Sequence, residues 1–247
     1  MKKFSLFLIL IFLVISTVGA VALSPEEIIN RRDDNEYISS ARMEAEMIIK
    51  QKNREMKKEM IIYSEGDNAL TEFVNPRDRG TKYLKRGDTL WMYFHEAEES
   101  MEISGHMLEQ NMMGSDFSYQ DMLESEQLTE LYDFELVDEK DVDGRPAYVL
   151  LGTARKDKEV AYYERKIWID QERFIGLREE LFARNGRLLK VAKVKEVKEF
   201  DEGRYYPVKM VMEDQLRAES STTFLINELE FDVEFPEDFF THEALEL

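Results

Sequence analysis

The chain has no cysteine and only three histidines among its 247 residues. Without cysteine there can be no disulfide, no thiolate metal site and no lipid anchored on a cysteine at the start of a mature chain. His95, His106 and His242 lie far apart, without the spacing of a zinc site. The sequence also lacks a Gly-x-Ser-x-Gly elbow and a phosphate-binding glycine loop. We therefore predict no catalytic residues, no metal and no cofactor.

Positive charge is scarce. The chain has 33 Lys and Arg against 52 Asp and Glu, which gives a formal net charge of −19. This balance disfavours nucleic acid and anionic lipid surfaces as partners. It suits a protein that stays off membranes, and it suits equally well a protein whose charge only keeps it in solution.

Long hydrophobic runs are confined to the first residues. Met1-Lys2-Lys3 precedes an apolar run from Leu6 to Ile15, and small residues follow up to Ala20-Val21-Ala22. These are the three parts of a secretory signal peptide, so residues 1–22 are predicted to be cleaved and residues 23–247 to form a single domain. An uncleaved membrane anchor is the alternative, but the apolar run is shorter than the ~20 residues that a bilayer span needs.

The remaining sequence is typical of antiparallel strands. Apolar runs alternate with charged turns, and Asp143-Gly144 and Asn185-Gly186 are strong hairpin signals. Two capping boxes predict short helices, one at Ser24-Pro25-Glu26-Glu27 and one at Ser118-Tyr119-Gln120-Asp121 that continues to Leu128. Strands are predicted at residues 47–49, 60–63, 70–74, 134–142, 147–153, 162–169, 174–182, 188–197, 205–212 and 223–233.

Along these strands one face is apolar, so the sheet must curl over something that covers it. In the last strand, for example, Leu225, Leu229, Phe231 and Val233 are predicted to point inward. The region from Met101 to Glu130 is the best candidate for the cover. About ten strands with few helices favour a mainly β, strongly curved or incomplete barrel with a helical plug, and a closed barrel around a small apolar ligand stays open as an alternative.

Methionine and aromatic residues gather in and before this cover. Methionine suits surfaces that repack around variable apolar partners, although ordinary core filling explains the same excess. Trp91 and Tyr93 alternate with Met92 and Phe94, so the two pairs point to opposite sides of their strand. The candidate lipid-binding or lid residues are Trp91, Tyr93, Met107, Met112, Met113, Phe117 and Tyr119.

A basic turn stands out in this acidic chain. Arg77 and Arg79 flank Asp78 between two predicted strands. We predict that they latch the cover or contact a lipid head group, since guanidinium groups donate well to carbonyl and phosphate oxygens. A solvated turn balanced by its own aspartates is the alternative.

The order of three motifs carries a family resemblance. These are Pro76-x-x-x-Gly80-Thr81, Gly87-Asp88-x-x-Trp91-x-Tyr93 and Met113-Gly114-Ser115-Asp116-Phe117-Ser118-Tyr119. Together with Trp168-Ile169-Asp170 and Tyr206-Pro207, they resemble the outer-membrane lipoprotein-sorting branch of the LolA/LolB-like periplasmic carriers. The resemblance implies an open antiparallel half-barrel whose apolar concavity is covered by a helical lid.

It also implies a function. Carriers of this type take lipoprotein acyl chains from an inner-membrane exporter across the periplasm. We therefore expect a periplasmic, non-enzymatic carrier of lipoprotein acyl chains or other lipids, neither lipid-anchored nor stably inserted in a membrane. Its partners would be the exporter and an outer-membrane acceptor. The alternatives are an accessory protein-binding module of a lipid exporter and a lipid hydrolase, for which Asp116 would be the acid to test.

Overall fold

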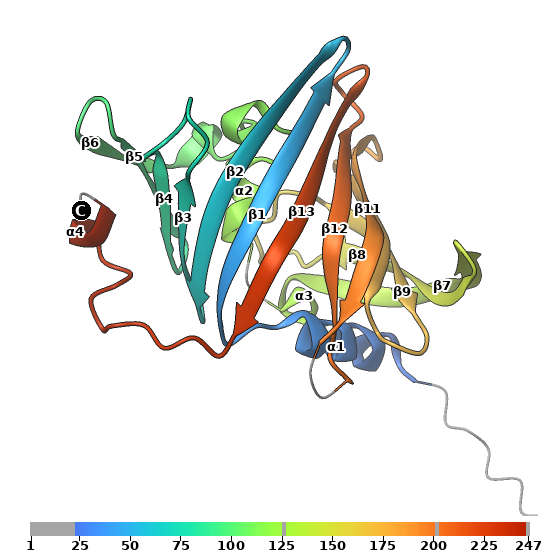
Figure 1. The fold of residues 1–247 in the computed structure, drawn as a ribbon. Coiled ribbons are helices and arrows are strands. Elements are labelled where there is room, and N and C mark those ends of the chain that lie inside the picture. Colours follow the sequence, from blue (N-terminus) through green and yellow to red (C-terminus); the bar gives the residue numbers. More distant parts are fainter. Residues whose placement is uncertain (1–22, 125–126, 201–202, 246–247) are drawn as a thin grey trace, which may run out of the picture.

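The computed structural model describes residues 23–124, 127–200 and 203–245 (Figure 1). The expected signal peptide, residues 1–22, lies outside the described residues. The described chain forms one 13-stranded sheet in which all neighbours are antiparallel, in the order β6-β5-β4-β3-β2-β1-β13-β12-β11-β10-β9-β8-β7. The predicted open, curved sheet with a few short helices is therefore confirmed.

The strands of the first half are β1 Ser40–Gln51, β2 Arg54–Glu65, β3 Asn68–Phe73, β4 Lys82–Arg86, β5 Thr89–Phe94 and β6 Glu99–Ile103. Those of the second half are β7 Tyr132–Val142, β8 Arg145–Ala154, β9 Glu164–Asp170, β10 Gly176–Phe182, β11 Leu188–Glu199, β12 Tyr205–Asp214 and β13 Ser220–Phe231. The helices are α1 Pro25–Glu36, α2 Tyr119–Leu123, α3 Leu128–Leu131 and α4 His242–Leu245, with 3-10 turns η1 Gly105–Met107 and η2 Met112–Gly114.

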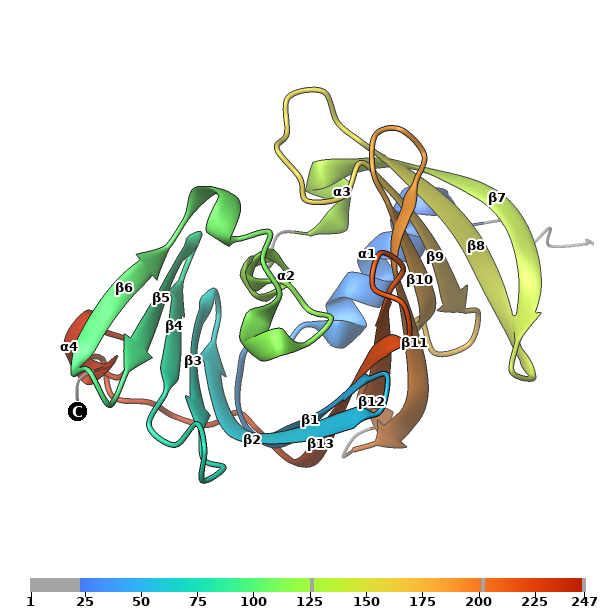
Figure 2. The ribbon, with the colours of Figure 1, turned by 90° about the horizontal axis from the view of Figure 1, so that it is seen from above.

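The sheet curves around a segment that we call the cover, residues 104–124 with η1, η2 and α2. Figure 2 shows the cover inside the curve, together with α1. In β1 buried residues alternate with partly exposed ones from Ser40 to Ile49. Ala45, Met47 and Ile49 are buried, whereas Glu46 and Ile48 between them are partly exposed. This period of two turns one face of the strand toward the cover.

Hairpin chemistry accounts for the connections. Asp143 and Gly144 both have positive φ, 52° and 86°, as a type I′ turn between β7 and β8 requires. The short strands on either side of the Pro76 to Gly80 turn are β3 and β4, and Gly87 makes the turn into β5. The sequence signals thus fix where successive strands reverse.

Both predicted capping boxes are present. The Ser24 side chain accepts from the N–H of Glu27, and Ser118 does the same with Asp121. The second helix was predicted too long, because α2 ends at Leu123. A new helix, α3, starts at Leu128, where the Asp33 carboxylate accepts the backbone N–H at 3.1 Å. A side chain of α1 therefore caps the first turn of α3.

For the last strand, β13, the prediction that Leu225 points inward was also wrong. Phe224 and Ile226 face the inner clusters, whereas Leu225 does not. The pairing with β1 skips Asn227, because Ala45 opposes Ile226 and Glu44 opposes Glu228. This bulge shifts the alternation by one residue, so one phase cannot hold along the whole strand.

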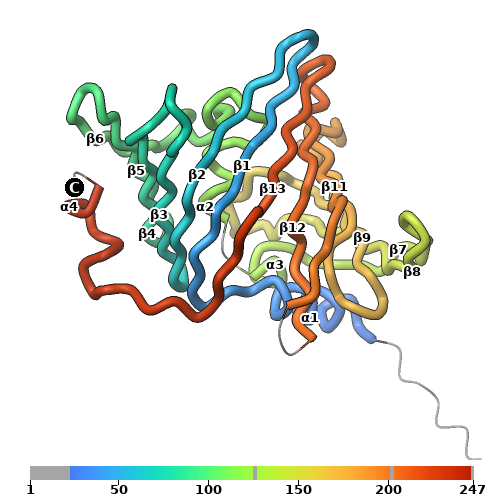
Figure 3. Tube along the Cα trace, viewed as in Figure 1, coloured from blue at the N-terminus to red at the C-terminus, as the bar shows by residue number. Residues whose placement is uncertain are grey.

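The segment after β13 covers apolar residues on the outer face of the sheet. After β13 the segment runs back along the outside of the sheet to α4, beside β4 (Figure 3). Phe239, Phe240 and Leu245 pack there with Leu70 and Leu84. The sheet is therefore covered inside by the cover and α1, and outside, over β3 to β5, by its own C-terminal segment.

Candidate functional site

The apolar side of the cover lies on the inner face of β1 to β6. Five candidate residues, Met107, Met112, Met113, Phe117 and Tyr119, belong to this methionine cluster, which also contains Met47, Met60, Phe73 and Tyr83 from the sheet. Met112 and Leu123 are the buried members of this cluster that come from the cover, and the other cluster members from the cover are half-buried. The structure thus brings five of the seven predicted lid residues together.

Trp91 and Tyr93 are not among them. Both belong to the cluster outside the sheet, with the C-terminal Phe240 and Leu245. Trp91 meets the ring of His242 edge-on at 6.1 Å, and Met92 faces the methionine cluster in its place. Placing Trp91 and Tyr93 with the cover was therefore wrong, because alternation separates two faces of a strand without saying which one is concave.

Arg77 and Arg79 are exposed, and within the described residues neither makes a hydrogen bond or ion pair. Their turn is organised by Asp78, which accepts from Lys58 Nζ and Asn75 Nδ2, both at 2.6 Å. Although burial opposes it, these hydrogen bonds and the Lys58 charge hold the pKa of Asp78 below its ordinary value. The structure gives the predicted latch no contact with the cover.

The cover is attached to the second half of the sheet by carboxylates. Asp116 is fully buried, and its oxygens accept from Ser220 Oγ at 2.5 Å and Thr222 Oγ1 at 2.6 Å, both on β13. The Arg217 guanidinium donates to the carbonyl of Ser115 at 2.8 Å. Asp116 is thus a structural anchor of the cover.

The second attachment is Asp121, the capping acid of α2. Its carboxylate accepts from Lys190 Nζ on β11 and from the Tyr162 hydroxyl, each at 2.7 Å. Burial alone would raise the pKa of Asp121, but the Lys190 ammonium and these hydrogen bonds hold it below its ordinary value. The carboxylate is therefore charged at neutral pH.

The third attachment is an arginine that the sequence analysis missed. Arg165 on β9 is 5% exposed and pairs with Glu124 of the cover and, at 2.9 Å, with Glu179 on β10. Its guanidinium also lies over the Tyr132 ring, 5.1 Å from the centroid. Burial opposes the charge, but the two glutamates raise the pKa of Arg165 well above its ordinary value. Its position in phase with the buried Ile167 was the available signal.

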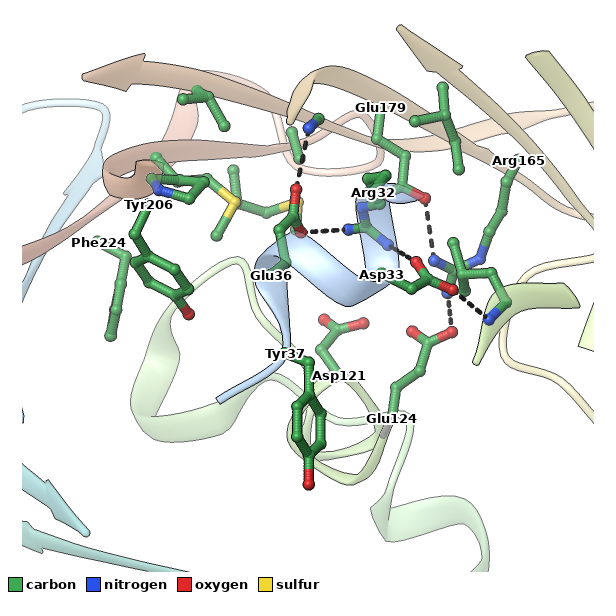
Figure 4. A pocket seen from close by; sticks show the side chains of 18 of the residues that line it. Arg32, Asp33, Glu36, Tyr37, Asp121, Glu124, Arg165, Glu179, Tyr206 and Phe224 are labelled. Atoms are coloured by element: carbon green, nitrogen blue, oxygen red, sulfur yellow. Dashed lines mark hydrogen bonds and ion pairs between the residues drawn. The ribbon is translucent and has the colours of Figure 1, made fainter. Parts of the chain in front are cut away.

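A cavity of about 760 Å³ lies between the cover, α1 and strands β9 to β13 (Figure 4). Its apolar wall comes mostly from the strands, with Ile167, Leu181, Ala192, Val194, Val208, Met210, Met212, Phe224 and Ile226, and Phe117 joins it from the cover. This volume falls within the range of roughly 300–1,000 Å³ typical of small-molecule sites. Of the predicted lid residues, Phe117 alone lines it.

The other end of this cavity is polar. Glu36 at the end of α1 accepts from the Gly176 N–H at 2.9 Å and pairs with Arg32 at 2.7 Å, and Figure 4 shows both groups beside Glu179. Burial raises the pKa of Glu179 above its ordinary value, despite Arg165 and Arg32 nearby. Burial also raises the pKa of Tyr206 to about 12, so its hydroxyl stays neutral.

A second cavity, of about 910 Å³, lies on the other side of these attachments. The two cavities share Glu124 and Tyr162 in their linings. The ionic attachments of α2 therefore separate the two spaces.

The ionisable side chains that line the first cavity are carboxylates, arginines, a lysine and tyrosines. Among the described residues that line it there is no histidine, serine or cysteine, the usual sources of a hydrolytic nucleophile or base. No group of three His, Asp or Glu side chains within the described ranges is arranged to hold a metal ion. In the same residues, no helix is long and apolar enough to cross a membrane.

Similarity to known proteins fits this geometry. A family described as "Uncharacterized protein" matches residues 65–247. Among curated proteins, no sequence matches the chain. Among solved structures, a DUF1329 family protein from Desulfovibrio piger is 26% identical with a TM-score of 0.83, over 90% of this chain and 100% of that one.

Two further structures are similar. An outer membrane lipoprotein-sorting protein domain from Vibrio parahaemolyticus is 26% identical with a TM-score of 0.81, over 91% of this chain and 98% of that one. A LolA superfamily protein from Nitrosomonas europaea is 21% identical with a TM-score of 0.75, over 90% and 100%. The resemblance to the LolA/LolB-like lipoprotein-sorting proteins is thereby confirmed.

Proposed function

Because the chain belongs to the family that matches residues 65–247 and has the fold of lipoprotein-sorting proteins, we propose that it is a periplasmic lipid carrier without catalytic activity. Its cargo would be the acyl chains of lipoproteins or of other lipids. It would receive them from an inner-membrane exporter and deliver them toward the outer membrane. In this proposal the mature chain begins at Leu23.

The observation that carries the proposal is the cavity of about 760 Å³ between the strands and the cover. Its wall is apolar over β9 to β13, and each methylene buried there contributes on the order of 0.8 kcal/mol. The methionine cluster beside it contains half-buried side chains that can repack as a chain enters. Binding energy would thus come from buried apolar area.

The contacts of Arg165 suggest how access is controlled. It lies beneath the cover and joins Glu124 to Glu179 and so takes, in this proposal, the latch role that the sequence suggested for Arg77 and Arg79. Release would need a partner that binds the open cover more tightly than the closed one, since only differential affinity shifts such an equilibrium.

Native mass spectrometry of the mature protein purified from an envelope extract tests the proposal. We expect a stoichiometric acylated species, identified after organic extraction. Phe117→Gln places an amide in the cavity wall and should lower lipid occupancy by about tenfold, because a buried polar group without a partner costs roughly 1–3 kcal/mol. Phe94→Gln is the matched control, because Phe94 is 37% exposed and does not line the cavity.

Two outcomes would contradict carriage. A protein that stays empty after incubation with lipoproteins and neutral lipids, but forms a stable protein complex, would favour the accessory module. Steady turnover of lipid esters that is lost in Asp116→Asn, with the fold retained, would favour a hydrolase.

A further inference from the structure

Acidic groups outnumber basic groups in the lining of the 760 Å³ cavity. Seven carboxylates line it: Asp33, Asp34, Glu36, Asp67, Asp121, Glu124 and Glu179. Four cationic side chains line it: Arg32, Arg165, Arg178 and Lys193. Asp34, Asp67 and Glu124 are exposed, whereas the other four carboxylates are half-buried. The polar end of the cavity is therefore an environment of net negative charge.

The cations of the lining are already occupied. Arg32 pairs with Glu36 at 2.7 Å and with Asp33 at 2.9 Å, and Arg165 pairs with Glu179 at 2.9 Å and with Glu124. The other two pair with acids outside the lining. Arg178 binds Glu180 at 2.6 Å, and Lys193 binds Glu213 at 2.8 Å. A phosphate entering this cavity would have to displace a carboxylate before it met a cation.

Two buried donors are nevertheless left over. The Nε atoms of Arg32 and Arg165 have no hydrogen-bond partner within the described residues, and both belong to side chains that line the cavity. A buried N–H without a partner costs free energy, so an acceptor that reaches it is favoured. Both Nε atoms are buried, so an ester or amide carbonyl reaches them only when neighbouring side chains move, and it then supplies an acceptor without adding charge.

On the premise of the proposed carrier function, we infer that this cavity selects lipids by the charge of the head group. It accepts acyl lipids whose polar end is an uncharged ester or amide, and it rejects anionic phosphate head groups. Glu36, Glu124 and Glu179 are the selecting residues. They occupy the cations that a phosphate would need, and their own negative charges repel a phosphate.

The test is an internal competition. The mature protein is incubated with phosphatidylcholine vesicles that carry equal amounts of dioleoylglycerol and dioleoylphosphatidylglycerol, which share their acyl chains. It is then separated from the vesicles, and its bound lipids are measured by mass spectrometry. We expect dioleoylglycerol to exceed dioleoylphosphatidylglycerol by on the order of tenfold, as one uncompensated charge in such a site implies.

A charge-neutralising variant identifies the selecting group. Glu36→Gln keeps an oxygen that accepts from the Gly176 N–H but leaves Arg32 with Asp33, at 2.9 Å, as its remaining ion pair, so it should lower the ratio of bound dioleoylglycerol to dioleoylphosphatidylglycerol by several-fold. The same substitution at exposed Glu135 on β7 changes the net charge equally and should leave the preference unchanged. If Glu36→Gln strongly lowers the unfolding temperature, Asp34→Asn at the exposed rim of the cavity is tested in its place. We expect this variant to lower the ratio of the two bound lipids by a smaller factor.

The outcomes distinguish a failure of the head-group selectivity from a failure of the proposed carrier function. Equal or preferred uptake of dioleoylphosphatidylglycerol by the unaltered protein would overturn the selectivity and leave carriage standing. If Glu36→Gln and Glu135→Gln reduced the preference for dioleoylglycerol equally, the overall charge of the protein would explain the preference. The cavity would then not be the selecting site. Uptake of phosphatidylcholine alone would overturn the selectivity, and uptake of no lipid at all would overturn both the selectivity and the proposed function.

Discussion

The two halves of the inner face are covered in different ways. Over β1 to β6 the cover makes apolar contacts, many of them through methionine. Over β9 to β13 the cover is held by three acids that bond side chains of the strands. Asp116 bonds Ser220 on β13, Asp121 bonds Lys190 on β11, and Glu124 bonds Arg165 on β9. Apolar contacts are non-directional and adapt to a new shape, whereas ion pairs hold one geometry. We therefore expect the cover to keep its hold on the first half and to detach from the second.

The largest effect should come from removing the buried cation. Arg165→Met leaves Glu124 and Glu179 close together without their partner, which should lower the free energy of unfolding by about 3–5 kcal/mol. Urea unfolding measures this loss. Arg178→Met is the matched control, because its pair with Glu180 is partly exposed and should contribute less than about 1 kcal/mol. Similar losses in the two variants would remove the distinction between buried and exposed pairs.

A smaller effect is expected on the apolar side. Met112 is 6% exposed in the methionine cluster, and Met112→Ala should cost about 2 kcal/mol, at the low end for such truncations because the cover can settle into the space. Urea unfolding measures this loss of stability as well. Met101→Ala on β6 is the control, since Met101 is 38% exposed. If Met112→Ala cost no more than Met101→Ala, the first half would not be closely packed.

The smallest effect should come from acid, because it acts on the cover and leaves the sheet intact. The pKa of Asp121 is lower in the folded protein than its ordinary value of 3.8. Its stabilising contribution is therefore complete above that value and is lost as the pH falls through the lowered pKa. Hydrogen exchange of the cover amides, relative to those of β1, should increase in that acid range.

Asp121→Asn is the control for this effect. Its amide cannot pair with Lys190 as an anion, so its cover amides should exchange faster at neutral pH and respond less to acid. An unchanged acid response in this variant would assign the titration to another carboxylate of the cover.

Much of the fold could be predicted from local sequence signals. Caps at Ser24 and Ser118 and the turn at Asp143-Gly144 act within a few residues, so the sequence displays them directly. The one apolar face of the strands indicated the curvature and the cover, and the family resemblance implied the open half-barrel with a helical lid. The faces of individual strands were harder, since the bulge at Asn227 depends on pairing with a distant strand.

The site could be predicted only in part. The apolar cover residues were found because methionine and aromatic side chains signal burial by their type. Arg165 was missed because arginine is usually exposed, and its partner Glu124 is 41 residues away. The latch was instead assigned to Arg77 and Arg79, whose sequence neighbourhood is basic but whose side chains are exposed. Buried ion pairs between segments that are far apart in the chain leave little trace in a single sequence.

The centre of the sheet is formed by strands from opposite ends of the chain. β1 pairs with β13, and the Ser39 hydroxyl donates to Asp232 across 193 positions of sequence. Contacts of such long range slow folding, because the loop they close is ordered before it is stabilised. A nascent chain that lacks its last strand cannot join the two halves. The protein must therefore complete its fold after synthesis has passed β13, and until then the edge of β1 has no partner strand from the other half and is open to chaperones that bind extended chains.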